Sequence, residues 1–76
     1  MSAFSQRLIQ LRAARSLSQA DVAKETGVVV RAYQRYEYGQ REPQLSALVR
    51  LADFYGVTLD YLAGRSDDPG TSPKGR

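Results

Sequence analysis

The sequence predicts an all-α fold, a compact bundle of five short helices, from three observations. Apolar residues recur at the spacing of one helix face in successive segments of the chain. Glycines follow these segments at the positions where helices end. The chain has 76 residues, 42% of them hydrophobic, and no cysteine, so it has room for one core and no disulfide to support it. Short, closely packed helices meet these limits.

The first predicted helix begins near Phe4. Phe4, Leu8 and Leu11 recur at i, i+4 and i+7, and polar residues fill the other sides, so the segment predicts an amphipathic helix that ends near Arg15.

The second predicted helix covers about Gln19–Thr26. Ser18 and Asp21 have the spacing of a capping box, which satisfies the first backbone N–H groups of a helix. Gly27 follows where a helix end favours a left-handed residue. The residues expected to face inward are Ala20, Val22 and Ala23.

The third segment, about 29–38, fits two structures. Three consecutive valines from Val28 favour a strand by their β-propensity, but Tyr33 and Tyr36 are spaced i, i+3 as on a helix. A complementary polar stripe supports the helix, which we therefore favour. Its residues are Arg31, Gln34, Arg35 and Tyr38.

Two more helices are predicted after the third. Gly39 ends the third helix, and Pro43 disfavours helical conformation at the residue before it, so that a new helix begins after it. The fourth begins about Gln44, and Gly56 ends it. The fifth is Leu59–Leu62, with Thr58 as its N-cap and Gly64 as its stop. The inward residues of the fourth helix are expected to be Leu45, Leu48, Leu51, Ala52 and Tyr55.

These helices place the folded domain in residues 1–64. Residues 65–76 contain no Leu, Ile, Val or aromatic residue and are rich in Pro, Gly and Ser, so we expect a flexible polar tail. For this segment, a linker to a removed partner domain or a cloning remnant is as good an interpretation as any function.

The composition excludes most enzyme classes. No cysteine or histidine is present, so thiol nucleophiles, imidazole bases and the usual zinc sites are absent, and we expect no enzyme, metal or cofactor. The net charge of +3 is compatible with a local basic patch that faces a polyanion. No apolar stretch is long enough for a membrane span or a signal peptide, so we expect a cytoplasmic protein with no membrane partner.

The segment from Gln19 to Tyr38 predicts two helices that meet across a tight turn at Gly27, with Ala23 small where the helices approach. Packing of the second helix through its tyrosines would leave Arg31, Gln34 and Arg35 in solvent. Such a convex polar surface fits the major groove of DNA, which is about 12 Å wide.

Residues 4–64 resemble the Cro/CI-type (XRE) helix-turn-helix family, which includes the lambdoid phage repressors. The resemblance implies a lambda-repressor-like fold and control of transcription through operator DNA, usually by a homodimer. It is carried by Leu17-Ser-Gln-Ala-Asp-Val-Ala, Thr26-Gly-Val, Arg35-Tyr-Glu, Gly39-Gln-Arg-Glu-Pro and Leu51-Ala-Asp-Phe-Tyr-Gly-Val-Thr-Leu-Asp-Tyr-Leu.

The resemblance also implies roles for individual residues. It places the base contacts on the third helix, where an arginine suits guanine, a glutamine suits adenine and a valine suits the thymine methyl group. The candidate base contacts are Val30, Arg31, Gln34 and Arg35. The candidate phosphate contacts, which set register without reading sequence, are Gln19, Tyr38, Gln40 and Arg41, aided by the backbone N–H groups after Gly39.

The resemblance further implies an ion pair between Arg12 and Glu37, which would join the first and third helices. The plainer interpretation is that Glu37 is a free surface carboxylate. If the two residues do pair at the surface, the pair would contribute only about 0–1 kcal/mol to stability. Two positions depart from the family pattern: Val29 and Gln44 stand where helix N-caps are commonly Ser or Thr.

One module buries only about 600–1,000 Å² on DNA, so we expect a homodimer on half-sites about 34 Å apart. Phe54, Val57 and Leu62 are candidate interface residues, although all three equally suit the core of the monomer. The leading prediction is a transcriptional regulator, more specifically a repressor of a palindromic operator. The alternative is a protein-interaction module, such as an antitoxin or the target of an antirepressor, with a protein antagonist as partner.

Overall fold

The computed structural model describes residues 2–70. In this range the chain forms five α-helices and no strand, which confirms the predicted fold class. The valine-rich segment after Gly27 leads into a helix, so the helix favoured for this segment is confirmed over the strand. The helices are α1 (Ala3–Ala14), α2 (Gln19–Thr26), α3 (Val30–Glu37), α4 (Leu45–Tyr55) and α5 (Leu59–Ala63).

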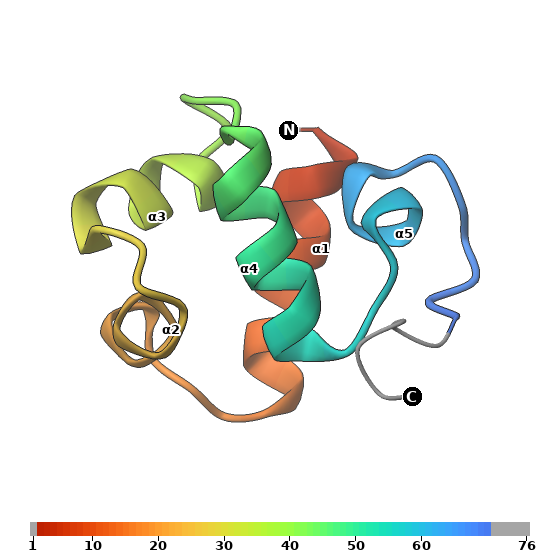
Figure 1. The fold of residues 1–76 in the computed structure, drawn as a ribbon. Coiled ribbons are helices and arrows are strands. Elements are labelled where there is room, and N and C mark those ends of the chain that lie inside the picture. Colours follow the sequence, from red (N-terminus) through yellow and green to blue (C-terminus); the bar gives the residue numbers. More distant parts are fainter. Residues whose placement is uncertain (1, 71–76) are drawn as a thin grey trace.

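Helix α4 runs through the middle of the bundle, with α2 and α3 on one side and α5 on the other (Figure 1). Helix α1 packs against α3 and α5, and α2 packs against α3 and α4. The two helices of the predicted helix-turn-helix therefore form one side of the molecule, away from α5.

The core takes residues from all five helices and from the loop before α5. Phe4 of α1 and Tyr36 of α3 contact each other there, with ring centroids 5.9 Å apart. Buried apolar area is the main favourable term in folding, and this core joins the first helix directly to the third. Its buried members are Phe4, Leu8, Val22, Ala23, Tyr33, Tyr36, Ala47, Leu51, Ala52, Tyr55, Val57 and Leu62.

Two residues that were expected to face inward are exposed. Ala20 lies on the solvent side of α2, and Leu45, at the first position of α4, is 70% exposed. At about 100° per residue, each lies roughly a quarter to a third of a turn from the middle of its helix's buried stripe. Ala47, which was not predicted, faces the core instead of Leu45.

Three helices begin with a side-chain cap. Ser2, Ser18 and Thr58 accept hydrogen bonds from backbone N–H groups of α1, α2 and α5. Ser18 and Asp21 form the predicted capping box, and the hydrogen bonds from Ser18 lower the pKa of the Asp21 carboxyl. Helices α3 and α4 have no side-chain cap at Val29 and Gln44, the two positions that depart from the family pattern.

The chain beyond Gly64 is held against the bundle as far as it is described. Arg7 of α1 donates hydrogen bonds to the carbonyl oxygens of Tyr61 and Ser66 and to the Asp67 carboxylate, the last at 2.8 Å. The Thr58 N–H donates to the carbonyl oxygen of Pro69 at 3.0 Å. These contacts involve residues 65–70 of the segment that is expected to be a flexible polar tail, and residues 71–76 lie outside the described range.

The described helices are also short. None of those within residues 2–70 is both long and apolar enough to cross a membrane.

Candidate nucleic-acid interface

The turn between α2 and α3 sets the direction of α3. Gly27 ends α2 in the left-handed conformation, with φ of 73°, and the Val28 N–H donates to the Ala23 carbonyl oxygen at 3.0 Å. Val22 and Ala23 are buried beneath this turn. Ala23 is small where the two helices pack against each other, and only three residues, 27–29, separate the end of α2 from the start of α3.

Helix α3 has one buried and one exposed face. Tyr33 and Tyr36 are 0% and 4% exposed, whereas Arg31 and Arg35 lie on the exposed side. Val30 and Tyr38, two other predicted DNA contacts, are 43% and 55% exposed. The helix therefore presents two guanidinium groups, a branched apolar side chain and a tyrosine to solvent.

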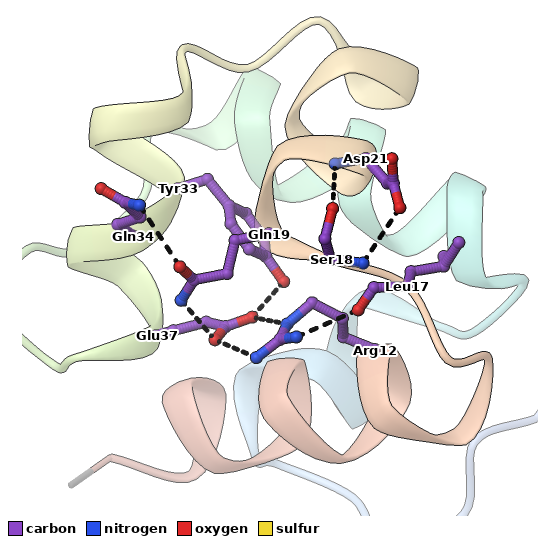
Figure 2. Close-up of polar contacts among 8 residues, drawn as sticks. All are labelled: Arg12, Leu17, Ser18, Gln19, Asp21, Tyr33, Gln34 and Glu37. Atoms are coloured by element: carbon purple, nitrogen blue, oxygen red, sulfur yellow. Dashed lines mark hydrogen bonds and ion pairs between the residues drawn. The ribbon is translucent and has the colours of Figure 1, made fainter.

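A buried carboxylate joins α3 to α1 (Figure 2). Glu37 is 1% exposed, and its two oxygens accept hydrogen bonds from Arg12 Nε at 2.6 Å and Arg12 Nη2 at 2.9 Å. Arg12 Nη1 also donates to the Leu17 carbonyl oxygen at 3.0 Å. The pair implied by the family resemblance is thus present, but it is bidentate and its carboxylate is buried, whereas the Arg12 side chain is 23% exposed.

Two more side chains donate to the same carboxylate. The Tyr33 hydroxyl donates to Glu37 Oε2 at 2.5 Å, and Gln19 Nε2 donates to Oε1 at 3.0 Å. Burial alone would raise the pKa of Glu37, but the hydrogen bonds from Arg12, Tyr33 and Gln19 outweigh it and lower the pKa. Burial, aided by the bond to Glu37, raises the pKa of Tyr33. The carboxylate is therefore held in its charged form.

Gln19 and Gln34 are connected to this network. Gln34 Nε2 donates to Gln19 Oε1 at 3.3 Å, so one line of hydrogen bonds runs from Gln34 through Gln19 to Glu37. Gln34 was expected to point freely into solvent, but it is half-buried and its amide already has a partner. The structure thus connects a predicted phosphate contact to a predicted base contact.

The loop between α3 and α4 carries the remaining predicted phosphate contacts. Gln40 and Arg41 are both exposed. The Gln40 N–H was expected to face the sugar–phosphate backbone, but it donates to the Arg35 carbonyl oxygen at 2.9 Å. Its side chain remains available at the surface, whereas this N–H serves to end α3.

Two polar residues beside α3 and the turn before it were not singled out from the sequence. Arg50 projects from α4 so that its Nη1 would lie 3.8 Å from a Cβ atom added at Gly27, beside the turn of the helix-turn-helix. Ser5 is 1% exposed and donates from Oγ to the Tyr36 carbonyl oxygen at 2.6 Å, a second anchor of α3 on α1. In the sequence, the only indication that Ser5 is buried is its position on the apolar face of the first helix. No residue near Arg50 in the sequence indicates a role for it.

The candidate dimer residues differ in accessibility. Phe54 is half-buried, and the Arg15 guanidinium lies over its ring at 5.4 Å. Val57 and Leu62 are 6% and 0% exposed, so they belong to the core of this chain, as the other interpretation had it. A side chain with almost no exposed surface cannot contact a partner. Of the three candidate interface residues, only Phe54 is therefore accessible to one.

The residues gathered at this surface are basic and amide side chains. No group of His, Cys, Asp and Glu side chains within residues 2–70 is placed to hold a metal ion. The arrangement suits hydrogen bonds and ion pairs with an anionic surface.

Comparison with protein families and known proteins gives consistent matches. Residues 8–62 match the family model described as helix-turn-helix. The chain is 41% identical over 66 residues, 87% of its length, to the HTH-type transcriptional regulator YobD of Bacillus subtilis. It is 39% identical over 64 residues, 84% of its length, to the cryptic phage CTXphi transcriptional repressor RstR of Vibrio cholerae.

A third relative is the HTH-type transcriptional regulator AnsR of Bacillus subtilis, 38% identical over 68 residues and 90% of this chain. The matched regions cover 59% of YobD, 58% of RstR and 59% of AnsR, so the chain spans less than two thirds of the length of these relatives. No solved structure matches the chain.

Proposed function

Because the chain belongs to the helix-turn-helix family, we propose that it binds double-stranded DNA sequence-specifically and regulates transcription. More specifically, we propose a repressor that covers a promoter and works in the cytoplasm. RstR, one of its relatives, is described as a transcriptional repressor.

One observation carries this proposal: the exposed face of α3 presents Arg31 and Arg35, while the opposite face is fixed in the core by Tyr33 and Tyr36. A rigid helix with outward arginines is the geometry that reads base edges in the major groove. We propose that Arg31 and Arg35 bind guanine O6 and N7 and that Val30 contacts a thymine methyl group.

The amide network changes the role that we propose for Gln34. Bidentate recognition of adenine needs both the oxygen and the nitrogen of an amide, and the Gln34 nitrogen already donates to Gln19. We propose that Gln19 contacts a phosphate while it holds Gln34 in place, so that Gln34 offers its oxygen to a base. Tyr38, Gln40 and Arg41 remain the other proposed phosphate contacts.

We propose that two copies bind a palindromic operator with half-sites about 34 Å apart. The interface would use Phe54 with Val49 and Leu59, two of the exposed apolar side chains of the last two helices, which are 37% and 40% exposed. Val57 and Leu62 support this surface from within the core.

The test is selection of bound duplexes from a random pool by the full chain. We expect an enriched motif with two symmetric halves spaced by one turn of the double helix. The Arg35→Gln variant should shift the preference at one position of each half-site, because a good bidentate pair discriminates by about 1–3 kcal/mol.

Arg65→Gln is the matched control, since it makes the same charge change at an exposed residue beyond α5. This variant should select the wild-type motif. Recovery of no enriched motif would contradict the proposal. An absence of duplex binding even at low salt would favour the alternative, a module that binds protein.

A further inference from the structure

Four arginines from three parts of the chain line one open cleft beside α3. The cleft has a volume of about 360 Å³ and lies between the turn at Gly27, helix α3 and the start of α4. Its volume is at the small end of the range for ligand sites in proteins. Its cationic lining residues are Arg31 and Arg35 of α3, Arg41 of the loop and Arg50 of α4.

No acidic residue lines this cleft. Within residues 2–70 the ion pairs are Arg7–Asp67 and Arg12–Glu37, so none of the four cleft arginines forms an ion pair. Arg50 also borders a neighbouring hollow that Glu25 and Asp53 line. Guanidinium groups that share a concave surface repel one another, and an anion in the cleft would remove this cost.

The backbone around the cleft also favours an anion. Helices α3 and α4 are the two described helices without a side-chain cap, and the first turns of both line the cleft through Arg31, Ala32, Ser46 and Ala47. The first N–H groups of a helix carry partial positive charge and bind phosphate well. The other three helices have their N-termini capped by Ser or Thr.

Arg50 is the residue that this cleft adds to the predicted site. It is exposed, and its Nη1 atom lies beside the Gly27 turn, where an added Cβ atom would be 3.8 Å away. Helix α4 thus extends a guanidinium toward the start of α3, opposite the arginines that α3 presents.

We propose that this cleft binds one phosphate group, held by Arg50 and Arg41 and by the uncapped starts of α3 and α4. A phosphate of the DNA backbone is one source of this group, and this part rests on the proposed function. A free phosphorylated small molecule is the other source. In either case Arg50 binds the phosphate and carries no sequence information.

The first experiment measures DNA affinity for Arg50→Gln by fluorescence anisotropy at several salt concentrations. If the phosphate belongs to DNA, affinity should fall about tenfold for the preferred duplex and for an unrelated duplex alike. The slope of log affinity against log salt should fall by about one, since one phosphate contact is lost.

Two further variants serve as controls. Arg50→Lys keeps the charge and should retain most of the affinity and the salt slope. Arg65→Gln makes the same charge change away from the cleft and should change the affinity much less. Arg50 is exposed, so we expect all three variants to keep the thermal midpoint of the wild type.

The second experiment needs no DNA. Inorganic phosphate is titrated into the ¹⁵N-labelled full chain at low ionic strength, and NMR shifts are followed at Gly27, Ser46 and the Arg50 side chain. Shifts in the wild type that are lost in Arg50→Gln support the cleft. If duplex affinity is equal in Arg50→Gln and Arg65→Gln, these shifts assign the cleft to a free phosphorylated ligand.

The proposal is overturned if Arg50→Gln binds duplexes like Arg65→Gln and inorganic phosphate shifts none of the three signals. Failure of the proposed function gives a different result: the wild type then binds no duplex, while the phosphate titration still decides whether the cleft is an anion site.

Discussion

Glu37 accepts four hydrogen bonds, two from Arg12 and one each from Tyr33 and Gln19, although it is 1% exposed. Removing a charge of this kind from water costs several kcal/mol, which close partners repay only when the geometry is good. The network therefore fixes one arrangement of α1, α2 and α3, because any other arrangement leaves a buried charge without partners.

Replacing Arg12 with methionine should lower the free energy of unfolding by about 3 kcal/mol, because it leaves the Glu37 carboxylate buried and unpaired. Urea denaturation followed by circular dichroism measures the loss. Adding Glu37→Gln to Arg12→Met should restore about half of it, since the neutral amide leaves no unpaired charge and its single oxygen can still accept from one of the two donors, Tyr33 or Gln19. Strictly additive losses in the double variant would refute this account, and Arg65→Met should change stability by less than about 0.5 kcal/mol.

The lowered pKa of Glu37 predicts how stability depends on pH. An unfolded glutamate titrates near pH 4.3, and in the folded chain the pKa lies lower, so the unfolded state binds more protons between the two values. The contribution to stability is complete above about pH 4.3. It is lost as pH falls through the folded-state pKa.

Urea midpoints measured from pH 7 downward test this prediction. The wild type should lose stability more steeply than Glu37→Gln below about pH 4.3, because the variant has no carboxyl group to protonate at this position. Parallel curves for the two proteins would show that Glu37 does not carry the acid sensitivity.

At the scale of elements, the helix starts fall into two groups. Ser2, Ser18 and Thr58 cap their helices, whereas Val29 and Gln44 leave the first N–H groups of α3 and α4 without a side-chain partner. A missing cap costs about 1 kcal/mol. The two uncapped helices are those that border the arginine cleft, so stability is lower where anion binding is proposed.

A side-chain cap installed at the start of α3 should stabilise the fold. Val29 is 70% exposed with φ of −59° and ψ of 132°, so Val29→Ser should accept a hydrogen bond from the first turn and raise the free energy of unfolding by about 1 kcal/mol. Ser18→Ala, at the capped start of α2, should lower it by a similar amount. Denaturation curves of both variants measure the effect, and equal stability of Val29→Ser and wild type would mean that these N–H groups have another partner.

The helices could be predicted because their signals are local. Ser18 and Asp21 mark the start of α2 and Gly27 marks its end, and each acts through residues at most four positions away. The exposed arginines of α3 followed from the same periodicity. Leu45 misled because the hydrophobic pattern does not show how far a neighbouring helix extends along α4.

The network and the cleft could not be predicted because they depend on distant parts of the chain. Gln34 reads as a free polar residue until α2 places Gln19 beside it. Arg50 has no neighbour in sequence that points to a site, and only the packing of α4 brings it to the Gly27 turn. The burial of Glu37 likewise follows from the positions of α1 and α2, which no local pattern encodes.

At the scale of the whole molecule, Arg7 connects the first helix to the last helix and to the segment that follows it. Its guanidinium bonds to Tyr61, Ser66 and Asp67 and lies over the Tyr61 ring, 4.1 Å from the centroid. The segment after Gly64 is too polar to add to the hydrophobic core, and one arginine offers enough donors to contact residues 65–70 through backbone carbonyl groups. Residues 65–70 are thus attached by polar contacts and not by a hydrophobic core.

Arg7→Ala should release this segment while leaving the bundle folded. Amide hydrogen exchange at Thr58, whose N–H donates to the Pro69 carbonyl oxygen, should become faster, and the free energy of unfolding should fall by about 1 kcal/mol. Asp67→Asn is the control, because an exposed ion pair contributes only about 0–1 kcal/mol. Unchanged exchange at Thr58 in Arg7→Ala would show that the segment is held by other contacts.

The position of this segment has a practical consequence. Residues 65–70 follow α5, on the opposite side of α4 from α3 (Figure 1). A fluorophore, an affinity tag or a fused reporter joined to this end of the chain is therefore attached on the side of the domain that faces away from α3. Attachment to a sensor chip at this end should leave the recognition surface open to a duplex in solution, whereas attachment through the loop around Arg41 should obstruct it.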